Sequence, residues 1–360
     1  MEKTYRIRMI TLHLDCRRLD DPIDALEEAS STVTEMRDFI VQQYSRDVWT
    51  KRIVLDYCTS EQANDVIETY TADREELISL GNYISQDIDL DFLDRLTEEG
   101  YFASLLLKGD WQEARKVSDL IHKLAEKDPS KATHIGINTL GERVNTPYFP
   151  LASTRTHMGV SVGLLYPNYL TNAYRRGVYR ELVNSIKIAA EEAWKILRES
   201  SKGTNMKPLG VDLSVSPWME ESTLGLVEYI AGVRLPEPGI AYGISLVNRA
   251  LLEASRTMPT IGFNEVQLPI AEDLKMKARV SELNTTARDL ARLSGVCLAG
   301  LDLAVVPADV DRVAGLLLEV RGYSLTKNKP LGVRIIPVED VEPGDKVYLE
   351  KFGETPVIPI

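Results

Sequence analysis

The stretch Gly295–Asp309, GVCLAGLDLAVVPAD, decides the fold class of this chain. It opens with Cys297 and Asp302 on either side of Gly300, and its apolar run closes at Val306-Pro307. Helical patterns precede and follow it. A continuous apolar run between two helices is typical of a strand that is buried on both faces of a parallel sheet. The stretch therefore predicts an α/β protein with a loop leading into a central strand.

Further apolar strand patterns alternate with helical patterns on both sides of this stretch. The strands that we predict are Leu331–Val338, Leu209–Ser216, Thr133–Thr139, Arg52–Tyr57 and Tyr5–Leu14. Their alternation with helices predicts a mainly parallel sheet, and the number of units favours closure into an α/β barrel. An open dinucleotide-binding sheet is disfavoured because no Gly-x-Gly-x-x-Gly follows the first strand. We expect one large domain over residues 1–360, with a small C-terminal hairpin at about 339–360.

Two regions have weaker patterns. The sequence from Ser60 to Leu107 is acidic and helical in pattern, and we predict no strand there. The sequence Gly141–Tyr169 is the least regular part of the chain. A loop of this length inside a compact domain is typical of a binding or lid segment.

The composition restricts the classes of partner. The chain has 360 residues, with 54 acidic and 42 basic side chains and a formal net charge of −12. Nucleic acids and anionic membranes require basic surfaces, so we expect neither as a partner. The N-terminal sequence has no signal-peptide pattern, and no apolar run approaches the roughly 20 residues that cross a bilayer. We therefore expect a cytoplasmic protein.

The cysteines and histidines do not form a recognisable framework. Cys16, Cys58 and Cys297 are far apart and include no CxxC pair, so neither a disulfide framework nor a zinc site is indicated. The histidines lack metal spacing such as His-x-x-x-His. We expect reduced thiols and no metal site built from cysteines or histidines, and the sequence identifies no cofactor.

Four segments resemble one family, the pyruvate formate-lyase-like proteins of unknown function that carry domain of unknown function 711. These segments are Gly210–Pro217 (GVDLSVSP), Val296–Asp302 (VCLAGLD), Lys329–Val338 (KPLGVRIIPV) and Ile7–Leu12 (IRMITL). The resemblance implies a ten-stranded α/β barrel with a loop inserted in its lumen, which is the fold of glycyl-radical enzymes. It implies no known activity. It does imply that a small ACT-domain protein, a module that binds amino acids, is a candidate partner.

In glycyl-radical enzymes, a cysteine on the inserted loop becomes a thiyl radical, and a glycine stores the radical. Cys297 matches the first role, and Gly322 in Glu319–Tyr323 (EVRGY) superficially matches the second. This segment has the pattern of a helix centre, however, so we interpret Gly322 as a helix glycine that permits close packing. Cys297 remains a candidate nucleophile, or alternatively a small core residue.

Two carboxylates interrupt apolar strands. Asp302 opens the strand after Gly300, and Asp212 lies beside Ser214 in Leu209–Ser216. A carboxylate in such a place must be paired, bound to a metal or at the rim. We predict that the two aspartates meet at one end of the barrel as acid/base groups or Mg²⁺ ligands, with Ser214 and Gly300 contacting the ligand. The alternative is that each is a separate, hydrogen-bonded structural residue.

Basic side chains suggest an anionic ligand. Arg155 and His157 lie in the irregular middle of the chain, and Arg334 is the one charge in Leu331–Val338. Such groups suit a carboxylate or a phosphate. The leading interpretation is a cytosolic enzyme that acts on a small anionic metabolite in a barrel lumen, without a stored glycyl radical. The alternative is a non-catalytic sensor or a regulatory subunit with an ACT-domain partner. In both cases we expect a homo-oligomer, and the sequence leaves catalysis itself open.

Overall fold

One curved sheet of ten strands forms the centre of the molecule. The computed structural model describes residues 5–71, 75–85, 87–155 and 157–360. The strand order is β7-β6-β1-β2-β3-β4-β5-β10-β9-β8. The strands are β1 (Arg6–Asp15), β2 (Val48–Asp56), β3 (Glu76–Ile84), β4 (Phe102–Leu106), β5 (Ile135–Asn138), β6 (Gly159–Leu165), β7 (Pro208–Asp212), β8 (Gln267–Pro269), β9 (Ala299–Pro307) and β10 (Gly332–Val338).

The sheet consists of two parallel halves that run in opposite directions. Strands β1 to β5 are parallel to one another, and so are β6 with β7 and β8 to β10. The halves join through two antiparallel pairs, β1 with β6 and β5 with β10. The prediction of an α/β fold with a mainly parallel sheet is confirmed.

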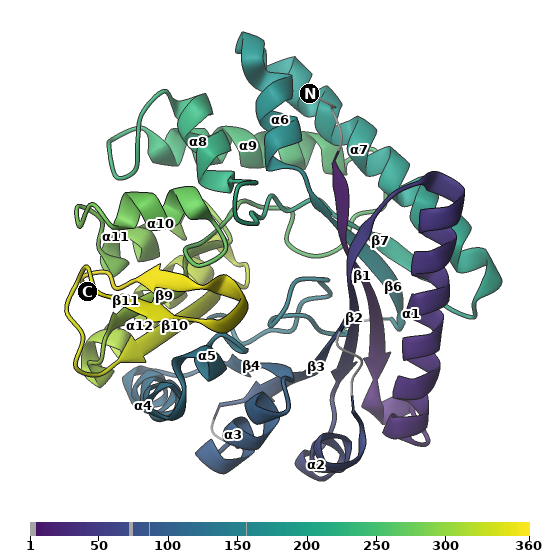
Figure 1. The fold of residues 1–360 in the computed structure, drawn as a ribbon, viewed down its shortest axis with the longest axis horizontal. Helices are drawn as coiled ribbons and strands as arrows, with labels where there is room; N and C mark the ends of the chain where they lie inside the picture. The colour runs from purple at the N-terminus through teal and green to yellow at the C-terminus, as the bar shows by residue number, and fades with distance from the viewer. Residues whose placement is uncertain (1–4, 72–74, 86, 156) are drawn as a thin grey trace.

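The sheet curls around an interior (Figure 1), and residues in or beside its two end strands, β7 and β8, pair with each other. Isolated parallel bridges pair Val211 with Thr260 and Val215 with Val266. The Val215 N–H donates to the Glu265 carbonyl at 3.2 Å, although β7 and β8 form no continuous ladder in the described residues. The architecture is therefore barrel-like, with its ends joined by single bridges.

Helices cover the outer face of the sheet (Figure 1). They are α1 (Pro22–Tyr44), α2 (Ser60–Thr69), α3 (Leu90–Glu98), α4 (Trp111–Lys127), α5 (Pro129–Ala132), α6 (Pro167–Ala173), α7 (Tyr179–Ser200), α8 (Thr223–Ala231), α9 (Ile240–Ser255), α10 (Leu274–Val280), α11 (Ala287–Leu293) and α12 (Val310–Lys327). Helix α1 shows why they form where they do: Asp21 caps its N-terminus, and Pro22 supplies the first helical position. In the described part of the chain, no helix is both long and apolar enough to cross a membrane.

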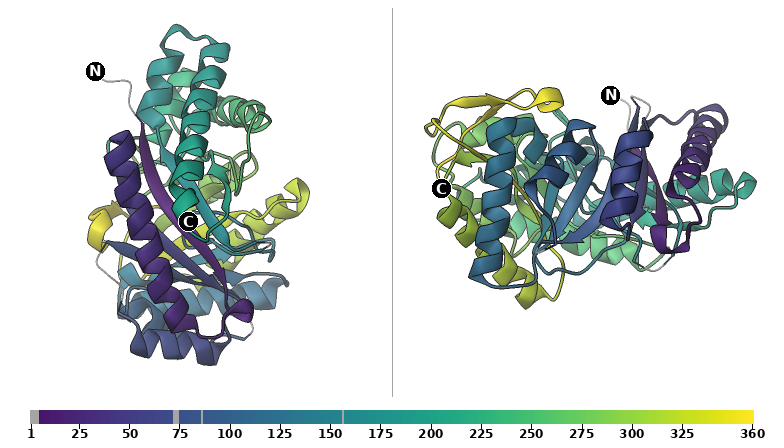
Figure 2. Two further views of the ribbon diagram at one scale, coloured as in Figure 1. Left: turned by 90° about the vertical axis from the view of Figure 1, so that its right-hand side faces the viewer. Right: turned by 90° about the horizontal axis from the view of Figure 1, so that it is seen from below.

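A small antiparallel hairpin lies at one end of the barrel. Its strands are β11 (Lys346–Tyr348) and β12 (Glu354–Pro356), and the short helix η4 (Glu350–Phe352) connects them. Figure 2 shows this hairpin in yellow, at the end of the barrel where β1 begins.

The residues between β5 and β6 run through the interior of the curved sheet (Figure 1). We call residues 139–155 and 157–158 the inner segment. Polar groups on the inner face of the sheet hold it: His13 Nδ1 lies 2.9 Å from the Ser153 carbonyl, and Asn82 Nδ2 donates to the Ala152 carbonyl at 3.0 Å. The Tyr148 hydroxyl donates to the Ser214 carbonyl at 3.1 Å. The interior is therefore filled by backbone as well as by side chains.

Three strands lie where the sequence predicts none, so those predictions were wrong. β3 and β4 lie between Ser60 and Leu107, and β6 lies in the stretch expected to be irregular. In β3 and β6, polar or small residues interrupt the apolar pattern that would have indicated a strand. In β3, Ser79 and Asn82 interrupt the apolar pattern, and in β6, Gly163 packs so closely on Met9 that a Cβ would clash with its sulfur.

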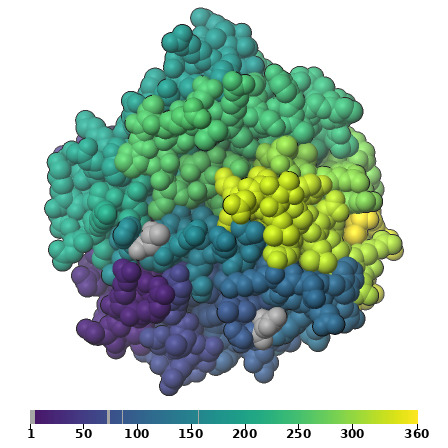
Figure 3. Space-filling view, turned by 180° about the vertical axis from the view of Figure 1, so that it is seen from behind, coloured from purple at the N-terminus to yellow at the C-terminus, as the bar shows by residue number. Residues whose placement is uncertain are grey.

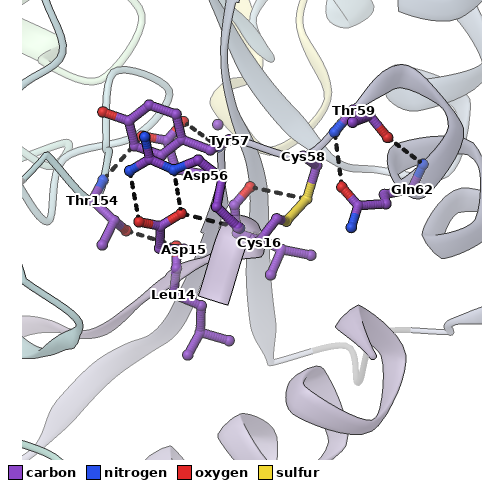
Figure 4. Close-up of a disulfide and its surroundings, with 12 residues drawn as sticks. Leu14, Asp15, Cys16, Asp56, Tyr57, Cys58, Thr59, Gln62 and Thr154 are labelled. Carbon is purple, nitrogen blue, oxygen red and sulfur yellow. Dashed lines mark hydrogen bonds and ion pairs between the residues drawn. A yellow bond between two sulfur atoms is a disulfide. The ribbon is translucent and has the colours of Figure 1, made fainter. Parts of the chain in front are cut away.

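A disulfide joins Cys16 and Cys58, which follow β1 and β2 (Figure 4). Their Cα atoms are 5.1 Å apart, although 42 positions separate them in sequence. The expectation of reduced thiols is therefore wrong for this pair. Adjacent parallel strands place Asp15 opposite Asp56, so the residues that follow both strands are neighbours. Cys297 is the free and buried cysteine.

We predict that the denatured protein titrates one thiol without reductant, that of Cys297, and three after reduction. Breaking the crosslink should lower the free energy of unfolding by about 2–4 kcal/mol, because the denatured chain regains the freedom that the bond removes. Thiol titration and denaturant unfolding measure the two effects. The variant Cys297→Ser is the control and should titrate no thiol before reduction. Three thiols in the unreduced wild type would contradict the bond.

Candidate functional site

A cavity of about 280 Å³ opens at the end of the barrel covered by the hairpin. We call it the lumen cavity. The first halves of β1 to β4, the residues after β7 and β8, the inner segment and η4 all contribute to its walls. Its lining residues are Arg8, Trp49, Thr50, Arg52, Leu77, Phe102, Tyr148, Phe149, Ser216, Trp218, Gln267, Glu272, Arg334, Lys351 and Phe352.

Aromatic rings form much of the wall of the lumen cavity. The rings of Trp49 and Trp218 meet edge to face with centroids 4.5 Å apart, and Trp218 also contacts Phe352 at 6.0 Å. On another side, Phe102 and Phe149 lie 5.5 Å apart. Such walls favour a ligand with an apolar or aromatic body.

Two arginines share one buried carboxylate at the cavity. Glu272 accepts from Arg8 at 2.6 Å and from Arg334 at 3.1 Å. Arg334 also binds Asp302 with two nitrogens, at 2.6 and 2.8 Å. Burial alone would raise the pKa of Glu272, but the charges of Arg8 and Arg334 outweigh it and leave that pKa below its ordinary value. Glu272 is therefore ionised, and both carboxylates are engaged by arginine side chains.

Arg52 has no carboxylate partner in the part of the chain that the structure describes. Its guanidinium donates to Thr50 Oγ1 at 3.0 Å and to the Pro147 carbonyl at 3.2 Å, and it lies 5.2 Å from the Phe149 ring centroid. Burial, and secondly the charge of Arg8, lower the pKa of Arg52 but leave it protonated at neutral pH.

Lys351 projects from η4 into the same cavity. Its Nζ lies 5.2 Å from the Phe102 ring centroid and 5.3 Å from that of Phe352. The residue as a whole is exposed, but its ammonium group lies among these rings. Burial of the ammonium, and then the charges of Arg52 and Arg334, lower the pKa of Lys351 to about 8.

The charges around the lumen cavity do not balance. Four cations, Arg8, Arg52, Arg334 and Lys351, face two carboxylates, Glu272 and Asp302. Buried charge is costly unless it is paired, so the arrangement leaves two positive charges for a bound anion to neutralise. Arginine also offers the planar donor fork that carboxylates and phosphates fit.

The predicted aspartates do not share a site. Asp302 pairs with Arg334 and lines a smaller void of about 30 Å³ next to the lumen cavity. Asp212 is buried elsewhere, where it accepts from Ser214 Oγ at 2.7 Å, Thr146 Oγ1 at 2.9 Å and the Phe263 N–H at 3.0 Å. The prediction that the two carboxylates meet is corrected, because fixed donors already satisfy Asp212 and tie the inner segment to β7. Ser214 belongs to this structural group.

Cys297 and Gly300 lie on the helix side of β9 and do not line the lumen cavity. The Cys297 Sγ lies 3.1 Å from the Leu293 carbonyl, and burial raises the pKa of its thiol well above the ordinary value. A Cβ at Gly300 would lie 2.3 Å from the Leu290 carbonyl, so this glycine permits α11 to pack on β9. Cys297 is also absent from the inner segment, where a radical-forming cysteine was expected.

Gly322 lies in α12, as the helical pattern predicts. Nothing lies within 4 Å of the position that its Cβ would occupy. It is therefore a helix glycine, but it does not serve close packing.

Arg155 and His157 lie at the other end of the barrel. They line a surface depression of about 370 Å³ with Lys207 and Gly262. Figure 3 shows this end, where the teal inner segment lies between the purple start of the chain and its green later part. Thr156, between the two predicted residues, lies outside the described residues. Arg334 is thus the predicted basic residue that lines the lumen cavity.

Sequence reasoning missed Arg8, Arg52, Glu272 and Lys351. The sequence could have indicated Arg8 and Arg52, because each is a charge within a predicted apolar strand, as Arg334 is. No comparable signal marked Lys351, which lies in a polar hairpin.

For a metal ion, one group among the described residues has suitable ligand atoms within 4.8 Å of one another: His122, Glu126 and Glu339. It lies on α4 and after β10, and both glutamates are exposed. Exposed acidic groups of this kind are common without an ion, so the group identifies no metal centre.

Comparison with known proteins places the chain in a family. A model of the family described as "Uncharacterised ACR (DUF711)" matches residues 107–350, which is more than half of the chain. The chain belongs to this family. The resemblance seen in the sequence is thereby confirmed, whereas the likeness to pyruvate formate-lyase stays a prediction.

The relatives carry no assigned activity in their names. A UPF0210 protein of Pyrobaculum arsenaticum is 33% identical over 176 residues, which cover 46% of this chain and 39% of the relative. One of Methanopyrus kandleri is 33% identical over 42% of this chain and 35% of the relative. At 22% identity, a UPF0210 protein of Sulfurisphaera tokodaii matches 97% of this chain and 88% of its own length. The chain thus covers less than two fifths of the first two relatives.

We predict that Arg334→Met lowers the free energy of unfolding by about 3–5 kcal/mol, because it leaves Asp302 as a buried charge without its partner. The matched control is Arg312→Met, which removes an exposed pair with Asp309 on α12. That change should cost at most about 1 kcal/mol. Denaturant unfolding measures both values, and equal losses would contradict the buried pair.

Proposed function

We propose that this chain binds a small anionic metabolite with an apolar body in the lumen cavity and acts on it as a cytosolic enzyme. The observation that carries the proposal is the excess of positive charge: Arg52 and Lys351 line the cavity and have no carboxylate within ion-pair distance among the described residues. A bound anion would neutralise them, and the aromatic rings would hold the rest of the molecule.

Enzymatic action is supported by the state of the Lys351 amine. Its pKa of about 8 allows it to give or accept a proton near neutral pH, which an ordinary lysine does poorly. Among the other lining residues, no histidine is present and Glu272 is engaged by two arginines. Lys351 is therefore our candidate for the group that transfers protons. Cys297, Asp302 and Asp212 have no part in this proposal.

A non-catalytic sensor is the second candidate. The observation in its favour is that ion pairs with arginines fix both carboxylates at the cavity, which leaves few groups there to transfer protons. A sensor would bind the anion without consuming it. The ACT-domain partner, the homo-oligomer and the cytoplasmic location stay predictions. A disulfide such as Cys16–Cys58 is unusual in most reducing compartments.

We predict that small aromatic carboxylates such as phenyllactate and benzoate bind this protein and that Arg52→Gln weakens their binding. Loss of a charged hydrogen-bond partner should cost roughly 1.5–3 kcal/mol of binding free energy, or about one to two decades in Kd. Isothermal titration calorimetry measures Kd, and a thermal-shift screen that also includes inorganic phosphate identifies the preferred anion. The control is Arg37→Gln, which removes an exposed arginine paired with Glu75 on the outer surface. If no anion binds, or if both variants bind as the wild type does, the proposed site is wrong.

We predict that the affinity for a carboxylate falls as the pH rises from about 7 to about 8.5, a range that ends below the lowered pKa of Arg52, about 9. The folded pKa of Lys351 is lowered to about 8, so the ammonium loses its proton, and with it its attraction for the anion, in this range. Calorimetry across the pH series measures the effect. In Lys351→Arg the guanidinium stays charged, and the decline should be absent. A decline that persists in this variant would assign the titration to another group.

A further inference from the structure

Lys351 is the most accessible nucleophile of the lumen cavity. The other candidates are engaged: the Tyr148 hydroxyl donates to the Ser214 carbonyl, and Thr50 Oγ1 donates to the Arg8 carbonyl. Ser216 lines the cavity, but none of the lining residues is a histidine that could activate it. The amine of Lys351 therefore remains as the group that can attack a bound ligand.

We propose that Lys351 forms an imine with the carbonyl carbon of a small 2-oxo acid whose carboxylate is bound by Arg52. This inference rests on the proposed anion site and names its substrate class. The neutral amine attacks the carbonyl carbon and forms a C–N bond. The carbonyl oxygen takes up two protons and leaves as water, so the protonated or neutral C=N bond replaces C=O with no change in oxidation state.

The surroundings of the amine suit this chemistry. Lysines become nucleophilic at neutral pH when they are desolvated or lie next to another cation, and both conditions hold here. The Nζ lies near the Phe102 and Phe352 rings, and the charged groups that act on it are Glu272, Arg52, Arg334 and Glu350. At about pH 7.5, a lysine with a pKa of about 8 has roughly 200-fold more free amine than one with the ordinary value of about 10.5.

The same cavity selects the class of carbonyl compound. A carboxylate next to the carbonyl group would meet Arg52, which has no carboxylate partner among the described residues. The edge-to-face pair of Trp49 and Trp218 would contact an apolar or aromatic side chain. A sugar or an aldehyde without an acidic group would leave the cationic side of the cavity unneutralised. The chemistry therefore points to 2-oxo acids with apolar side chains.

Reductive trapping tests the imine. The whole protein is incubated with phenylpyruvate and sodium cyanoborohydride, which reduces a C=N bond to a stable secondary amine, and the modified residue is located by peptide mass spectrometry. We expect labelling at Lys351 to exceed that at Lys346 by at least about tenfold at neutral pH, because Lys346 is exposed and pairs with Glu354. Phenyllactate, which has no carbonyl group, should compete with the labelling.

Two measurements separate this inference from the proposed function. Lys351→Arg should lose the labelled peptide, and Arg52→Gln should weaken both phenyllactate binding by calorimetry and the labelling of Lys351. Binding of phenyllactate without preferential labelling of Lys351 would overturn the imine and leave the anion site in place. Absence of binding together with labelling no greater than that of Lys346 would overturn both.

Discussion

A curved sheet of ten strands encloses more space than its inward side chains can fill, and the inner segment fills that space. A backbone placed there must satisfy its polar groups within the protein. His13 and Asn82 supply such partners from β1 and β3, and Asp56 adds another by accepting from the Thr154 N–H at 3.1 Å. Asp212 also holds the segment, by accepting from the side-chain hydroxyl of Thr146. These polar residues of the sheet therefore supply hydrogen-bond partners for the buried inner segment.

This constraint separates structural charges from functional ones. Asp212 and Asp56 each accept several hydrogen bonds from fixed donors, and Arg143 also pairs with Asp56. Donors that belong to the fold therefore already occupy both carboxylates. At the lumen cavity, Glu272 and Asp302 pair with Arg8 and Arg334. Arg52 and Lys351 also line the cavity and have no carboxylate partner among the described residues. These two positive charges are the ones that we propose a ligand neutralises.

The sequence predicts the α/β fold well and the residues of the lumen cavity only in part. The pattern of Leu331–Val338 predicts a buried strand. Its one charge, Arg334, indicates the cavity, because a cation in an apolar run requires a partner. Strands β3 and β6 escape prediction because residues distant in the chain account for their polar and small positions: Asn82 donates to the Ala152 carbonyl, and Gly163 packs on Met9. The Cys16–Cys58 pair depends on strand register, and the position of Lys351 depends on where the hairpin folds. Both depend on tertiary structure, which local sequence patterns do not predict.

Because the two half-sheets run in opposite directions, each end of the barrel carries the loops that follow one half-sheet and the loops that precede the other. In a barrel whose strands all run one way, the loops that follow the strands gather at a single end. Here residues after β7, β8 and β10 line the lumen cavity, whereas the residues that follow β1 and β2 carry the disulfide at the opposite end. The loops at the disulfide end can therefore change in length or sequence without altering the residues that line the cavity.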